Sequence, residues 1–202
     1  MDIQDLKIHH EKNKFLIRQR LDEFRKIKKG KDKNEYFKEL CFCLLTAGTS
    51  AELGIKTINH LGGVIHYGNE ADILERLKEV YRFYNVRARY IFLARDKFKQ
   101  VDFTKEGNEL RDEIVEKILG IGYKEASHFL RNIGYKDYGI LDKHIINCLY
   151  ELKVIDEAIP PKNRRDYLEI EEKMRRFSEK NNIDFDELDL VLWSWKTGKV
   201  LK

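Results

Sequence analysis

The sequence of 202 residues has only two prolines, three cysteines and no apolar run near the ~18 residues that a membrane-spanning helix requires. Cys41, Cys43 and Cys148 lie in apolar stretches, and their number and spacing exclude the even disulfide framework of a small secreted protein. The charged residues that follow Met1 are unlike a signal peptide. We therefore expect a soluble, cytoplasmic protein with reduced, buried thiols.

The balance of charge is also close to even. Lys and Arg number 39 against 35 Asp and Glu, which leaves a net charge of only +4. Total charge thus does not predict nucleic-acid binding, and any basic face must come from segregation of charge. The 42% apolar content excludes a disordered chain, and the 37% charged content suits a solvated helical surface, a composition also typical of heat-adapted proteins. A single compact unit with two lobes is expected.

Apolar residues recur at helical spacing throughout the chain, and no stretch alternates long enough to predict a strand. Ile17, Leu21 and Phe24 indicate a first helix that ends in the basic run 26–33, which we expect to be followed by a solvated loop. Ser50 and Asp184 are the expected N-caps of two later helices. Further helices are predicted over 35–45, 70–80, 86–98, 108–119, 142–152 and 163–180. The fold class is therefore all-α.

The densest motif is the segment Ile118–Lys124, between two helical patterns. Gly120 and Gly122 allow a tight reversal with positive φ, and let backbone N–H groups approach an anion. The second helix is expected to begin near Tyr123, so its free N–H groups and dipole favour a phosphate at the same place. Ile121 is expected to anchor the turn. The alternative reading of the two glycines alone is a simple connection between packed helices.

The segments 119–124 and 139–144 together resemble the helix-hairpin-helix DNA glycosylase superfamily. The resemblance implies two helical lobes with the DNA-binding cleft between them, and a hairpin over about 111–132. It divides the chain into N-terminal helices (1–50), a central lobe (51–145) and C-terminal helices that complete the first lobe (146–202). It also implies that Gly120, Gly122 and His144 contact the DNA backbone. The carbonyls of Ile118 and Ile121 are the expected ligands of a structural monovalent cation.

Lys124 and Asp142 are the expected catalytic residues. The superfamily's bifunctional members carry a lysine two positions after the second hairpin glycine, with one residue between them, where Lys124 stands. A helix start and partial burial both disfavour an ammonium, which favours a nucleophilic amine. Asp142 suits an N-cap, and an aspartate held in this way is also able to stabilise a cationic sugar. The implied reaction is base displacement through a Schiff base, followed by β-elimination, with no cofactor and no catalytic metal.

The substrate base is suggested by resemblance. No cysteine follows Cys148, so the iron-sulfur cluster of the endonuclease III and adenine-excising subfamilies is not expected. The segments 40–46, 85–90 and 195–202 resemble the short 8-oxoguanine DNA glycosylases of archaea and thermophilic bacteria. That likeness implies that Lys202 helps distinguish 8-oxoguanine, with Trp193 or Trp195 stacking on the flipped base. Burial of Trp195 and fraying of Lys202 are the structural alternatives.

A flipped nucleotide leaves a gap and an unpaired partner base. The segments 47–50 and 83–87 are expected near that base, with Phe83 or Tyr84 as a wedge, and Arg87 and Ser50 as partner-base contacts. A core aromatic and a surface arginine are the plain alternatives. The expected partner is duplex DNA containing oxidised guanine, bound by a monomer without membrane contact. The competing functions are a non-catalytic DNA-binding hairpin protein, a glycosylase for another oxidised base and an unrelated helical scaffold.

Overall fold

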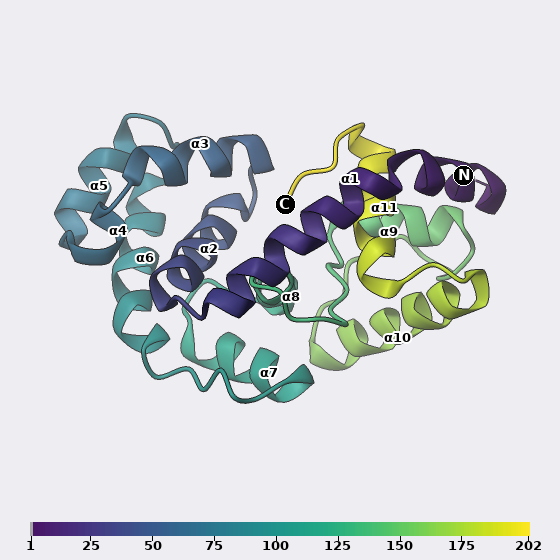
Figure 1. Cartoon of the computed structure of the whole chain (residues 1–202). Helices are drawn as coiled ribbons and strands as arrows, with labels where there is room; N and C mark the ends of the chain where they lie inside the picture. The colour runs from purple at the N-terminus through teal and green to yellow at the C-terminus, as the bar shows by residue number, and fades with distance from the viewer. Residues whose placement is uncertain (1) are drawn as a thin grey trace. The chain divides into compact units, whose positions relative to one another are not determined.

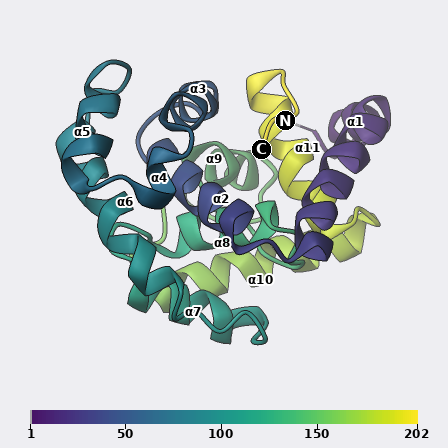
Figure 2. The same cartoon turned by 60° about the vertical axis from the view of Figure 1, so that its left-hand side comes forward.

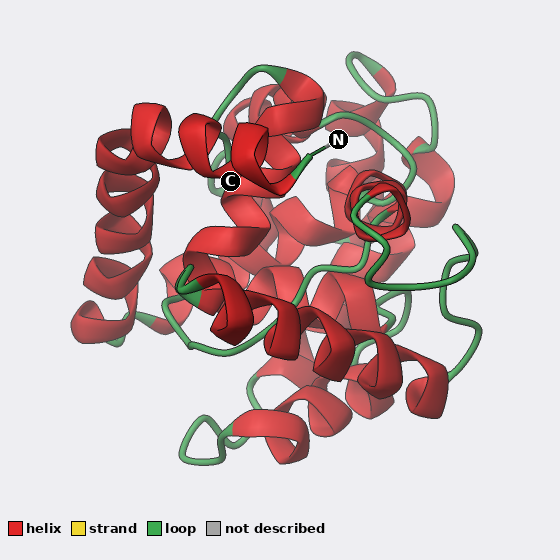
Figure 3. Cartoon of the chain, turned by 90° about the vertical axis from the view of Figure 1, so that its right-hand side faces the viewer, coloured by secondary structure: helices red, strands yellow, loops and turns green. Residues whose placement is uncertain are grey.

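The computed structural model describes residues 2–202, and every regular element in that part of the chain is a helix (Figures 1 and 3). The all-α prediction is confirmed. The chain divides into a terminal unit, Met1–Lys26 with Leu130–Lys202, and a central unit, Ile27–Phe129. Each division falls inside a helix, since α1 (Ile3–Gly30) runs across the first and α8 (Tyr123–Asn132) across the second. Within residues 2–202, no helix is long and apolar enough to cross a membrane.

The core of the central unit is built on α2 (Lys33–Thr46), which is drawn among its neighbours in Figure 2. Every side chain from Leu40 to Leu45 is fully buried, because a helix that is apolar all round packs on all sides. It contacts α3, α4 and α6. The other helices of this unit are α3 (Ala51–Leu61), α4 (Val64–Tyr67), α5 (Glu70–Lys78), α6 (Tyr84–Phe98) and α7 (Gly107–Lys117).

The terminal unit is built on α11 (Phe185–Thr197), which packs against α9 (Lys143–Glu151) and α10 (Arg164–Asn181). Side chains 185–192 of α11 are all buried. Glu187 joins α11 to α1, since its two carboxylate oxygens lie 2.6 Å from His10 Nε2 and 2.7 Å from Arg18 Nε. The first helix is thereby joined to the last one at two positions.

Helix ends follow the local chemistry of the sequence. Ser50, Asp142 and Asp184 are N-caps whose side chains accept backbone N–H groups, as predicted. The first helix ends within the basic run 26–33, at Gly30, as expected. The loop that follows is short, because Asp32 already caps α2 by accepting from Asn34 N at 2.8 Å. The four-residue α4 is not predicted, since one turn carries too little periodicity.

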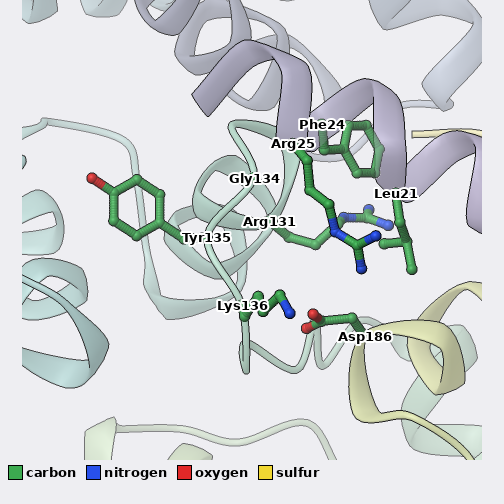
Figure 4. A pocket seen from close by; sticks show the side chains of 8 residues that line it. All are labelled: Leu21, Phe24, Arg25, Arg131, Gly134, Tyr135, Lys136 and Asp186. Atoms are coloured by element: carbon green, nitrogen blue, oxygen red, sulfur yellow. The ribbon is translucent and has the colours of Figure 1, made fainter. Parts of the chain in front are cut away.

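A small cavity of about 10 Å³ lies within the terminal unit, beside α1 and the start of the 134–142 segment (Figure 4). This is about the space that one water molecule needs. Its lining includes three cationic side chains and one carboxylate, from Arg25, Arg131, Lys136 and Asp186. A hollow of this size does not admit a nucleobase.

Candidate functional site

The hairpin between α7 and α8 forms as the sequence predicts, but its two glycines differ. Gly120 has φ +87°, and a Cβ built there would lie 2.3 Å from Cδ2 of Tyr90, so both backbone and packing demand glycine. Gly122 has no positive φ, and its Cβ would meet only Glu125 Oε2 at 3.4 Å. The expected left-handed freedom is therefore used at Gly120 and not at Gly122.

Buried contacts hold the two helices of the hairpin together. Arg111 on α7 is 1% exposed, and its Nη1 donates to Ser127 Oγ on α8 at 3.0 Å. The hydroxyl of Tyr123 donates to Asp112 at 3.0 Å. Ile121 is buried, and its N–H donates to the Ile118 carbonyl at 3.2 Å. These contacts fix the two helices of the hairpin against each other. The monovalent cation at the hairpin carbonyls stays a prediction.

Lys124 lies in the first turn of α8, directly after the hairpin. Its side chain is half-buried, at 28% exposure, and Nζ is 2.8 Å from Glu125 Oε1. The position agrees with the predicted helix start and partial burial. The ion pair with Glu125 is a contact that the sequence did not predict.

Asp142 belongs to the terminal unit and caps α9. His144 N and Ile145 N both donate to Asp142 Oδ1, each at 2.8 Å. Both capping bonds end on one oxygen, which leaves Oδ2 for another partner. His144 is half-buried in the first turn of α9. Asp142 is thus the expected N-cap of α9, and its catalytic role stays a prediction.

The C-terminal aromatic residues take intermediate positions. Trp193 and Trp195 are half-buried on α11, and the Trp195 ring meets the His9 ring edge-on, with 5.3 Å between centroids. Lys202 is half-buried, as are the two residues before it. Trp195 lies outside the fully buried stripe of α11, and residues 200–202 are not fully exposed. Their role toward a base stays a prediction.

The structure brings together two of the segments expected near the partner base. Arg87 on α6 donates through Nη2 to the carbonyl of Ala47 at 2.9 Å, which joins α6 to the loop before α3. Ser50 caps α3. Phe83 is 37% exposed at the N-cap position of α6, with the Arg82 guanidinium 4.2 Å from its ring centroid, and Tyr84 is half-buried. The role of Phe83 or Tyr84 as a wedge stays a prediction.

Several residues around these elements were not found from the sequence. Tyr90 packs on Gly120, and Arg111 bonds Ser127 across the hairpin, but helical periodicity does not reveal contacts between residues 16 or more positions apart. Tyr167, Glu171 and Asp189 bind the backbone before Asp142. One signal was present for the last of these, since Asp189 interrupts an apolar run on α11.

Comparison with known proteins gives consistent matches. The family model described as Ogg-HhH, 8-oxoguanine DNA glycosylase, matches residues 17–183. A curated relative, the 8-oxoguanine DNA glycosylase/AP lyase of Methanocaldococcus jannaschii, is 46% identical over 94% of this chain and 93% of its own. A relative of the same name from Picrophilus torridus is 43% identical over 93% of this chain and 90% of its own.

Two crystal structures are similar over nearly the whole chain. One is the M. jannaschii 8-oxoguanine glycosylase/lyase in complex with a 15mer DNA containing 8-oxoguanine. It has a TM-score of 0.91 and 44% identity, and the match covers 99% of this chain and 100% of that one. The other is the 8-oxoguanine DNA glycosylase of Thermotoga maritima, with a TM-score of 0.93, 34% identity, and coverage of 98% and 97%.

Proposed function

Because this chain belongs to the helix-hairpin-helix family of 8-oxoguanine DNA glycosylases, we propose that it excises 8-oxoguanine from duplex DNA and cleaves the strand through a Schiff base on Lys124. The observation that carries this proposal is a lysine in the first turn of α8, directly after the hairpin, in a chain whose family match includes both. The enzyme is a DNA glycosylase and AP lyase.

Lys124 is the nucleophile. Its free amine forms a bond to C1′ of the lesion nucleotide while the glycosidic bond breaks, and the departing base takes up a proton. The nitrogen lone pair then forms the N=C bond as the C1′–O4′ bond breaks, and the remaining amine proton passes to O4′, which gives an imine between Nζ and C1′ of the opened sugar. Abstraction of a C2′ proton then expels the 3′ phosphate by β-elimination. Water hydrolyses the imine and restores the lysine.

Asp142 supports both stages from the start of α9. Its Oδ1 is held by two backbone N–H groups, and Oδ2 is the oxygen that we assign to the substrate. A fixed carboxylate stabilises the positive charge that develops on the sugar as the base leaves. It also accepts a proton from the attacking amine.

The remaining assignments concern DNA. We assign the backbone N–H groups of the hairpin and the start of α9 to phosphates, through Gly120, Gly122 and His144. We assign recognition of the flipped base to the end of the chain, through Trp193, Trp195 and Lys202. The partner base is assigned to the side chains of Ser50, Phe83, Tyr84 and Arg87. The three free cysteines and the DNA substrate favour the cytoplasm as the place of action.

The experiment that tests the proposal is borohydride trapping on a panel of duplexes that carry oxidised purines, oxidised pyrimidines or uracil. We expect a covalent complex and strand cleavage with 8-oxoguanine, and loss of both in Lys124→Gln. Lys173→Gln, which removes a surface lysine of α10, is the matched control and retains trapping. Binding without trapping by the wild type indicates the competing function, a non-catalytic hairpin module. Trapping with another lesion indicates a different oxidised base.

A further inference from the structure

The backbone N–H groups of residues 139–141, which lead directly into Asp142, are bound by side chains. Gly139 N donates to Glu171 Oε1 at 2.9 Å, Ile140 N to Asp189 Oδ1 at 3.3 Å, and Leu141 N to the Tyr167 hydroxyl at 3.2 Å. The Tyr167 hydroxyl in turn donates to the Gly139 carbonyl at 2.6 Å. Three consecutive amides are thus bound by α10 and α11.

This cradle, defined as Tyr167, Glu171 and Asp189, lies inside the terminal unit. Tyr167 is 2% exposed, Glu171 6% and Asp189 4%. A Cβ on Gly139 would lie 3.3 Å from the Phe185 ring, so the segment is pressed closely against the helices behind it. Burying two carboxyl groups is unfavourable unless each is well bonded, and here each bonds a backbone amide.

We propose that Tyr167, Glu171 and Asp189 are positioning residues that aim the carboxylate of Asp142, an inference that rests on the role proposed for Asp142 above. Asp142 N donates to the Ile140 carbonyl at 2.8 Å, so the aspartate is coupled directly to the held segment. Its side chain is fixed from the other side by the first turn of α9. With both sides fixed, the direction of Oδ2 follows from the cradle.

The single hydroxyl of Tyr167 allows the sharpest test, because Tyr167→Phe removes one donor and one acceptor and keeps the ring. We expect the single-turnover rate of 8-oxoguanine excision to fall about tenfold, as a small misplacement of a catalytic group has effects of this order or larger. The Kd for the duplex should change less than twofold. Ser178→Ala is the matched control on the same helix, since it removes a buried hydroxyl that donates to the Ile183 carbonyl.

Loss of folding is separated from loss of positioning by the same measurement. An unfolded fraction lowers the amplitude of the single turnover, whereas a misplaced aspartate lowers its rate. A second pair of variants tests the hydrogen bond at Gly139. Glu171→Gln keeps an acceptor oxygen and should keep the rate within twofold, whereas Glu171→Leu should lower it. An equal loss of rate in these two variants overturns the role of Glu171.

A double-mutant cycle decides whether Tyr167 acts through Asp142. In an Asp142→Asn background, Tyr167→Phe should cause no further loss of rate, because the group that it aims is already disabled. A further tenfold loss in that background overturns positioning, and so does an unchanged rate for Tyr167→Phe alone. A wild-type rate for Asp142→Asn itself instead refutes the proposed function of Asp142, so the two failures are distinguishable.

Discussion

The ammonium of Lys124 lies 2.8 Å from a carboxylate oxygen of Glu125, its neighbour on α8. This ion pair holds the nucleophile of the proposed reaction at the helix start, and it must open before Nζ reaches C1′. An ion pair at this level of exposure is worth up to about 1 kcal/mol, which corresponds to about a fivefold factor in rate. Glu125→Gln should therefore raise the rate of borohydride trapping on an abasic duplex by about two- to fivefold.

The control for this prediction is Glu169→Gln, which removes a carboxylate paired with a lysine on α10. It should leave the trapping rate unchanged. A slower rate in Glu125→Gln would mean that the carboxylate takes part in proton transfer rather than restraining the lysine, and the restraint described above would be refuted.

The two hairpin glycines provide a matched pair for stability. Alanine at Gly120 would combine φ +87° with a Cβ 2.3 Å from the Tyr90 ring, whereas alanine at Gly122 meets only the flexible end of Glu125. We expect Gly120→Ala to lower the free energy of unfolding by about 1–3 kcal/mol. Gly122→Ala should change it by less than about 0.5 kcal/mol. Urea unfolding measures both, and equal effects would contradict the packing argument.

Local features of the fold were predictable from the sequence because their causes are local. Ser50, Asp142 and Asp184 were expected as caps, and each accepts the backbone N–H groups that a cap must accept. The hairpin was found for the same reason, since two glycines and the apolar residue between them specify a turn. The family expected from the motif at 119–124 and 139–144 is the one that matches.

Contacts between distant residues were not predictable, because helical periodicity indicates which face of a helix is buried but not which residues pack against that face. The need for glycine at position 120 comes from the ring of Tyr90 on another helix. Arg87 donates to the carbonyl of Ala47, 40 residues away in the sequence. The contacts of the cradle with residues 139–141 also join segments that are far apart in the sequence. In the sequence, Tyr167 and Glu171 look like ordinary residues of a charged helix. Their hydrogen bonds to residues 139–141 become visible only in the folded structure.

The proposed role of Lys202 in recognising 8-oxoguanine is testable by deleting that residue. Lys202 is half-buried together with the two residues before it. If it contacts the flipped base, deleting it should lower 8-oxoguanine excision by about 10- to 100-fold, the range expected for loss of one hydrogen bond that involves a charged group. Cleavage of a preformed abasic site needs no base contact and should stay within twofold. Parallel single-turnover assays on the two substrates measure this separation.

The matched control is Lys199→Ala, which removes an exposed lysine three residues earlier and should alter neither activity. If deletion of Lys202 lowers both activities equally, the residue supports the fold of the terminal unit and does not select the base. In that case, discrimination would have to come from Trp193, Trp195 or backbone groups.

Asp189 predicts how stability depends on pH. Burial raises the pKa of its carboxyl to about 6, opposed by Arg131 at 3.5 Å and by the hydrogen bond from Ile140 N, and reinforced by Asp142 and Asp186. In the unfolded chain, an aspartate has a pKa of about 3.9. Between these values the folded protein keeps a proton that the unfolded chain has lost. The stability contributed by protonated Asp189 is therefore full below about pH 4 and is lost as pH rises to about 6.

Asp189→Asn removes this titration. We expect the difference in unfolding free energy, wild type minus variant, to fall by about 2–3 kcal/mol between pH 4 and pH 7, and to stay constant above pH 7. The contributions of the other titrating groups cancel in this difference. Asp156→Asn, which replaces an exposed aspartate, controls for the loss of one charge. A difference that grows with pH would show that the pair with Arg131 outweighs burial, because a carboxyl with a lowered pKa gives the opposite slope.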